Sequence, residues 1–155
     1  MQYWLMKSEP KVFGLDDLAA RPGQREPWDG VRNYQARNWL RDDMKPGDRA
    51  FFYHSNCEVP GILGLMEIVT PGYPDPSQFD ATSRYFDPLS DPGRPRWYLV
   101  DVRYLRHLCH PISLTTLRRY TDGPLAGFRL LQKGSRLSIM PVSEDHCQFI
   151  LDLEC

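Results

Sequence analysis

Polar and aromatic side chains gather at the ends of four segments of this sequence, a combination that can bind a planar nucleic-acid base. The segments are Lys7–Pro10, Trp28–Tyr34, Tyr53–Asn56 and Arg136–Met140. The faces of a base stack on aromatic rings or guanidinium planes, and each stacking contact contributes about 1–3 kcal/mol. The edge of a base requires fixed donors and acceptors, such as serine, asparagine and backbone groups. All four segments place such groups beside turns, so we expect them to form a binding pocket.

Individual roles follow from the side-chain types. Trp28 and Tyr34 are candidates for stacking on the base, and Ser8, Asn33 and Ser55 are candidates for hydrogen bonds to its edge. The complete set of expected pocket residues is Lys7, Ser8, Trp28, Arg32, Asn33, Tyr34, His54, Ser55, Asn56, Trp97, Arg136 and Ser138.

The tryptophans also have an alternative reading as core residues. Trp4 and Trp39 lie within apolar patterns, which favours the core. Trp28 lies in a loop between Pro27 and Asp29 and fits a pocket wall and a core position equally well. Trp97 begins an expected strand, and this favours the core over the pocket.

Basic residues are concentrated between positions 103 and 136, where seven bases stand against the single acid Asp122. Phosphate contacts position a nucleic acid without reading its sequence, so this segment is a candidate for backbone contacts. The expected contact residues are Arg103, Arg106, Arg118, Arg119, Arg129 and Lys133. The alternative, a solvated surface without a partner, is equally open at this stage. The net charge of −1 argues against an indiscriminate polyanion binder but allows a local basic face.

Positive charge is also expected inside the pocket. Lys7, Arg32 and Arg136 supply it, with Glu9 and Asp29 as the nearby acids. We therefore expect a sulfonate, sulfate or phosphate anion to occupy the pocket when no base is bound.

No set of catalytic residues stands out. The sequence contains no GxGxxG after a strand, no GxxxxGK[ST], no HExxH and no GxSxG. His54 and Lys7 are the plausible acid–base groups of the expected pocket, and Cys57 near His54 lacks a third group that would orient the pair. The sequence thus favours a protein without catalytic activity and without a cofactor, although an enzyme that processes bases or nucleotides stays open.

The cysteines indicate neither a metal site nor a disulfide framework. Cys109 lies between His107 and His110, but alternation along a strand would turn His110 to the opposite face, so we expect no metal. Cys57, Cys109, Cys147 and Cys155 include no CxxC pair, and a chain of this length needs no disulfides to be stable. We expect free thiols and a cytoplasmic location. Neither a signal peptide nor an apolar run of about 20 residues is present.

The pattern of apolar residues predicts the elements that must position these groups. Strands are expected over 3–6, 48–53, 60–69, 96–105 and 137–140, the third with a glycine bend, and helices over 13–18, 33–44, 113–120 and 143–153. Asn33, Ser113 and Ser143 are the expected N-caps of the last three helices. The proline-rich segment 70–95 is expected to be a long ordered loop. Strands and helices that do not alternate favour an α+β domain with a curled sheet or small barrel, and we expect one domain over residues 1–155.

Six blocks of the sequence, in order, resemble the EVE domain family. They are Trp4–Pro10, Trp28–Asn38, Gly47–Asn56, Pro60–Gly64, Pro95–Val102 and Ser135–Val142. The resemblance covers essentially the whole chain. It implies the PUA-like fold, a curled β-barrel of mixed sheet with several short helices packed around it, and kinship with YTH and ASCH domains.

The resemblance also implies a function. EVE domains are thought to recognise modified bases, mainly modified cytosines in DNA, so we expect a non-catalytic reader whose partner is modified DNA rather than RNA, with no membrane partner. A small-molecule or nucleotide sensor with the same pocket stays open beside the enzyme. A duplex base must flip out of its stack to reach such a pocket, at a cost of a few kcal/mol.

Overall fold

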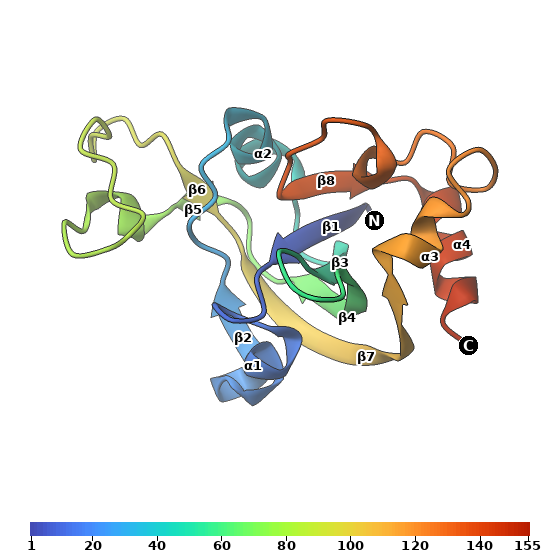
Figure 1. Ribbon diagram of the computed structural model, residues 1–155. Coiled ribbons are helices and arrows are strands. Elements are labelled where there is room, and N and C mark those ends of the chain that lie inside the picture. The colour runs from blue at the N-terminus through green and yellow to red at the C-terminus, as the bar shows by residue number, and fades with distance from the viewer.

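The centre of the molecule is a six-stranded mixed sheet that curls into a half-barrel (Figure 1). The computed structural model describes residues 1–155. In spatial order the strands are β2 (Arg25–Pro27), β7 (Asp101–Ser113), β4 (Gly61–Ile68), β3 (Arg49–His54), β1 (Tyr3–Ser8) and β8 (Ile139–Val142). Only the pair of β1 and β3 is parallel. The expected α+β class and curled mixed sheet are confirmed, and β2 and β8 remain as two edges of the sheet.

Both faces of the central strands are buried, which explains their continuous apolar runs. In β1, Trp4 and Met6 pack into one core cluster while Leu5 packs into another on the opposite face. The first cluster also contains buried residues of α1 (Leu15–Ala20) and α2 (Tyr34–Asn38). The second contains residues of α3 (Leu114–Arg118) and α4 (Glu144–Leu153). The short helices thus cover the two faces of the curled sheet.

The three expected N-caps are confirmed. The side-chain oxygens of Asn33, Ser113 and Ser143 accept hydrogen bonds from the backbone amides three residues later, at 3.0, 3.1 and 3.1 Å. The helix after Asn33 continues beyond α2 as a π-helical turn, η2 (Trp39–Asp43), before Pro46 and Gly47 end it. These local signals hold because a cap depends only on residues within one helical turn.

The strands differ from expectation in two places. The expected strand 96–105 is split into the short β6 (Tyr98–Leu99) and the long β7, which continues to the cap Ser113. No pattern in the sequence indicated β2, because this short, polar strand gains its order from pairing with β7. The glycine bend expected in β4 is present as two register shifts, one of them beside Gly64. A Cβ at Gly64 would lie 2.4 Å from a methyl carbon of Leu15, so close packing of α1 requires glycine here.

The expectation of four free thiols is wrong for two of them. Cys109 and Cys155 form a disulfide, while Cys57 and Cys147 are free. The end of α4 reaches β7 because Arg106 binds the carboxylate of Glu154 through two hydrogen bonds of 2.7 Å. The amide of Cys109 donates to the same carboxylate at 2.9 Å. These contacts join residues more than 40 positions apart in the sequence, so no local pattern indicated them.

The helices of this structure are too short and too polar to span a lipid bilayer.

The long loop between β4 and β7 is held by one buried amide, Gln78. The loop contains β5 (Tyr73–Pro74) and the short 3-10 helix η3 (Pro76–Phe79), and it projects from the sheet beside β6 (Figure 1). Gln78 Nε2 donates to the carbonyls of Asp75 and Trp97, while Oε1 accepts from Ser90 Oγ and the amide of Arg96. Because one side chain satisfies groups from both ends of the segment, the expected ordered loop is confirmed.

A buried carboxylate also fixes the start of the chain. Asp48, at the start of β3, accepts from the amide of Gln2 at 3.0 Å, from Trp4 Nε1 at 3.1 Å and from the amide of Lys45 at 3.1 Å. We predict that Asp48→Ala lowers the free energy of unfolding by about 1–3 kcal/mol, because it leaves buried donors without a partner. Denaturant titration measures this loss. Asp43→Ala removes an exposed carboxylate and should change stability little, and equal losses in the two variants would contradict the assignment.

Candidate functional site

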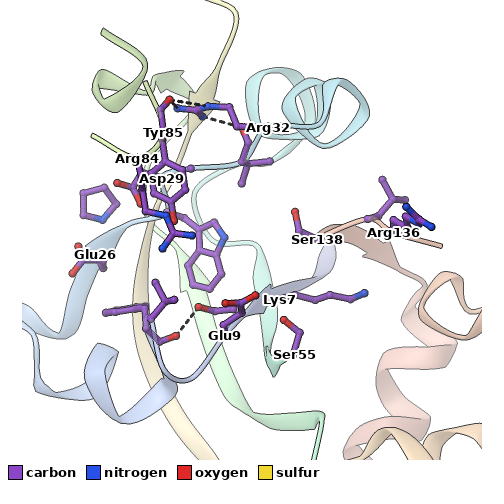
Figure 2. A pocket seen from close by; sticks show the side chains of 18 residues that line it. Lys7, Glu9, Glu26, Asp29, Arg32, Ser55, Arg84, Tyr85, Arg136 and Ser138 are labelled. Carbon is purple, nitrogen blue, oxygen red and sulfur yellow. Dashed lines mark hydrogen bonds between the residues drawn. The ribbon is translucent and has the colours of Figure 1, made fainter. Parts of the chain in front are cut away.

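A cavity of about 640 Å³ opens where several strands end on the same side of the sheet (Figure 2). Its walls come from the end of β1, the segment after β2, the residue after β3, the long loop and the segment before β8. The volume lies in the range of small-ligand sites. The lining residues are Lys7, Ser8, Glu9, Val12, Phe13, Glu26, Pro27, Trp28, Asp29, Gly30, Val31, Arg32, Ser55, Arg84, Tyr85, Arg136, Leu137 and Ser138.

The structure brings together seven of the twelve expected pocket residues. Lys7, Ser8, Trp28, Arg32, Ser55, Arg136 and Ser138 line the cavity, whereas Asn33, Tyr34, His54, Asn56 and Trp97 do not. The parallel pairing of β1 with β3 accounts for part of this result, because Ser8 lies opposite His54 and both strands end at the same place. Convergence of strand ends is therefore the feature that the sequence indicated correctly.

Tyr34 and Trp97 lie outside the cavity because they stack on each other. Their ring centroids are 4.8 Å apart with an interplanar angle of 23°. The guanidinium of Arg37 lies 4.9 Å from the Tyr34 ring, and Trp97 Nε1 donates to Asp87 at 2.7 Å. The Tyr34 ring thus stacks on Trp97 and does not line the cavity in which a base was expected.

The other three residues outside the cavity have structural partners. Asn33 caps α2, and Asn56 Nδ2 donates to Glu9 Oε1 at 3.0 Å. His54 Nε2 accepts from the amide of Leu15 at 3.1 Å, and burial lowers the pKa of this imidazole. The neutral ring therefore joins β3 to the start of α1, and one of the two acid–base candidates of the sequence does not face the cavity.

Arg32 lines the cavity, but its hydrogen-bond donors are occupied. The side chain forms five hydrogen bonds, which go to the carbonyl of Val31, the carboxylate of Asp75, the hydroxyl of Ser77 and, twice, the carbonyl of Tyr85. A guanidinium has five donors in a fixed fork. No donor is left over for a phosphate or a similar anion, so the anion-binding role expected for Arg32 does not fit its geometry. The Arg32 side chain instead joins the segment after β2 to the long loop.

Tyr85 is a wall of the cavity that the sequence analysis did not include. Its ring lies against Gly30, where an added Cβ would lie 2.5 Å from the ring carbon that bears the hydroxyl. Gly30 also has a positive φ of 82°, a conformation that favours glycine. The sequence carried a weak signal for this contact, because the segment 70–95 was expected to be an ordered loop and Gly30 lies in one of the expected pocket segments. Nothing in the sequence indicated that the two segments meet.

Trp28 serves both as a core residue and as part of the wall. Only 7% of it is exposed, and its ring packs edge-on against Phe52 with centroids 5.4 Å apart. The cavity nevertheless reaches it, together with Phe13 and Tyr85. The two readings left open for Trp28 are therefore both correct, and the cavity has aromatic walls on several sides.

Charged groups of both signs line the cavity. In Figure 2, Glu26, Asp29 and Arg84 lie on one side, with Lys7, Ser138 and Arg136 across from them and Glu9 beside Lys7. Burial raises the pKa of Asp29, and the nearby Asp75 and Glu26 raise it further. Burial lowers the pKa of Lys7, whose Nζ lies 5.8 Å from the centroid of the Tyr53 ring. The cavity therefore offers both donors and acceptors to a polar ligand.

The basic segment does not form one free surface. Arg103 pairs with Glu67, Arg106 pairs with Glu154, and Arg129 lies over the Trp39 ring at 5.3 Å. Arg118, Arg119 and Lys133 are exposed and form no ion pair. Burial raises the pKa of the Tyr53 phenol, and the positive charge of Arg118 partly offsets this rise.

Comparison with known proteins agrees with this architecture. The family model described as the EVE domain matches residues 2–153. This chain belongs to the EVE domain family. The family recognised from the six sequence blocks is confirmed.

Several relatives extend the match over the whole chain. Thymocyte nuclear protein 1 from mouse (Mus musculus) is 47% identical, with 98% of this chain and 73% of the relative covered. A solved structure described as the human THYN1 protein in complex with DNA containing 5-methylcytosine has a TM-score of 0.94 and 46% identity, with 99% and 98% of the two chains covered. A crystal structure from Pseudomonas putida has a TM-score of 0.93 and 44% identity, with 99% of each chain covered. These EVE domains thus share the half-barrel, and the PUA-like fold implied by the resemblance is confirmed.

Two glycines with positive φ allow a test of the wall formed by Tyr85. Gly47 has a φ of 94° and open space around it, whereas Gly30 has the ring of Tyr85 against it. Both alanine variants incur the backbone strain of about 1–2 kcal/mol. We predict that Gly30→Ala loses roughly 1–3 kcal/mol more than Gly47→Ala, because the ring must move. Denaturant titration compares the two, and equal losses would mean that the Gly30–Tyr85 contact is not tight.

Proposed function

We propose that this EVE domain is a non-catalytic DNA-binding module that holds one modified base, a modified cytosine such as 5-methylcytosine, in the cavity. The carrying observation is the cavity itself, with aromatic walls and charged groups of both signs in its lining. Its similarity to a structure described as bound to DNA containing 5-methylcytosine supports the choice of ligand. The base enters after flipping out of the duplex, because a paired base lies within the stack and cannot reach a cavity of the protein.

Polar groups of the cavity suit the two ends of a cytosine. Lys7 forms no ion pair, and neither Ser55 Oγ nor Ser138 Oγ has a partner within the protein. Cytosine carries acceptors at O2 and N3 and a donor at its 4-amino group. Donors of Lys7, Ser55 and Ser138 therefore suit the acceptors, and carboxylates of the cavity suit the amino group. Phe13, Trp28 and Tyr85 exclude water from the rings.

Backbone contacts divide into two groups. Arg136 at the rim, with the exposed and unpaired Arg118, Arg119 and Lys133, has guanidinium or ammonium donors free for phosphates. Arg103, Arg106 and Arg129 would first have to leave their present partners. We therefore propose that the first group provides most of the sequence-independent affinity.

We predict that a duplex with one 5-methylcytosine binds about fourfold more tightly than the unmodified duplex, since burial of one methyl group contributes roughly 0.8 kcal/mol. Fluorescence anisotropy at fixed salt concentration measures both dissociation constants. Equal affinities would contradict recognition of the modification. If neither duplex binds at low salt but the free nucleoside does, a small-molecule sensor replaces the reader as the function.

Arg136→Gln tests the division between base and backbone. We predict that it weakens binding of modified and unmodified duplexes by the same factor and reduces the slope of log K against log salt by about 0.9, the value for one lost phosphate contact. Arg41→Gln removes an exposed charge from η2, outside the cavity, and should leave the slope unchanged. If Arg136→Gln instead abolished the preference for the modified strand, Arg136 would contact the base rather than the backbone.

A further inference from the structure

Three carboxylates line the cavity, and only one of them is free to meet a ligand. Glu26 accepts from Arg21 Nε at 2.6 Å, and Glu9 accepts from Asn56 Nδ2 at 3.0 Å. Asp29 forms no hydrogen bond with another residue and no ion pair, and its contact is with its own backbone amide. Asp29 is exposed at the cavity, so its two oxygens are free to accept hydrogen bonds from a donor supplied from outside the chain.

Fixed peptide groups on both sides hold Asp29 in place. The amide of Trp28 donates to the carbonyl of Val100 at 2.9 Å, which anchors the residue before it to the strand region. The amide of Gly30 donates to the buried carboxylate of Asp75 at 2.9 Å, which anchors the residue after it. Neither anchor depends on the Asp29 side chain. The backbone that carries the carboxylate is thus fixed on both sides of Asp29.

We propose that the Asp29 carboxylate accepts a hydrogen bond from the exocyclic amino group of the bound base, so that the cavity takes amino pyrimidines and rejects keto pyrimidines. This inference rests on the proposed function and adds to it the residue that selects the base. An ionised carboxylate is only an acceptor. The amino group at C4 of cytosine is a donor, whereas the oxygen at C4 of thymine is an acceptor that repels the carboxylate.

The proposal has a sharp consequence for 5-methylcytosine and thymine. Both carry a methyl group at C5, so contacts with this group do not distinguish them. They differ at C4, where an amino group replaces an oxygen, and in the proton at N3. Across the cavity, Lys7 and Ser138 offer donors that either base satisfies through O2 (Figure 2). Discrimination between the two bases therefore falls on the opposite side, where Asp29 is the carboxylate without a partner in the protein.

Single-stranded oligonucleotides that differ at one position test this without the cost of base flipping. We expect the unaltered protein to bind the strand with 5-methylcytosine at least about tenfold more tightly than the strand with thymine, the size of one good edge contact. In Asp29→Asn the ratio should fall to within about twofold, because an amide offers a donor as readily as an acceptor. Asp29→Ala should lose the preference as well, through weaker binding of 5-methylcytosine alone.

Asp43→Asn is the matched control, because it makes the same substitution at an exposed carboxylate that does not line the cavity. It should keep the tenfold ratio. Thermal melting confirms that each variant is folded. The inference is overturned if the unaltered protein binds both strands equally, or if Asp29→Asn keeps the full ratio. Absence of binding to any modified or unmodified strand would instead overturn the proposed function.

Discussion

The buried carboxylate of Asp75 is the interaction on which the geometry of the cavity depends. It accepts from the amide of Gly30, from Arg32 Nη1 and from both the amide and the hydroxyl of Ser77. Its side chain is fully buried, and that of Arg32 is mostly so. The loss of one member of such a pair costs about 3–5 kcal/mol, because the remaining charge is buried without a partner. This ion pair therefore holds together two segments that no strand pairing joins.

The ion pair of Arg32 with Asp75 also positions Tyr85 in the wall of the cavity. Arg32 donates to the carbonyl of Tyr85, and the ring of Tyr85 lies on the surface that Gly30 leaves open. Gln78 ties the two ends of the long loop together at the same time. A loop with almost no regular structure thus becomes a rigid wall. Binding then requires little ordering of the protein, which reduces the entropic cost of holding a base.

Charge and curvature act together at this site. Since the sheet is a half-barrel with two free edges, the strand ends on one side converge without closing over the space between them. The segment after β2 brings Asp29 to one side, and the end of β1 brings Lys7 to the other. Burial shifts the pKa of each toward its neutral form, upward for Asp29 and downward for Lys7. A ligand that supplies the missing partner therefore stabilises the charged form of each side chain.

The sequence by itself determined the elements, the fold and about half of the candidate site. Apolar runs marked β1 and β3, and caps such as Ser143 marked helices, because these signals act over a few residues. The tertiary structure alone decided which polar groups are occupied. Arg32 meets Asp75 across 43 residues, Tyr34 stacks on Trp97, and Cys109 bonds to Cys155. A side chain carries the same donors and rings in any sequence context, but its partner is whichever group the fold brings within about 3 Å. The sequence could therefore name the groups able to bind a base, while the packing of distant segments decided which of them remain free to do so.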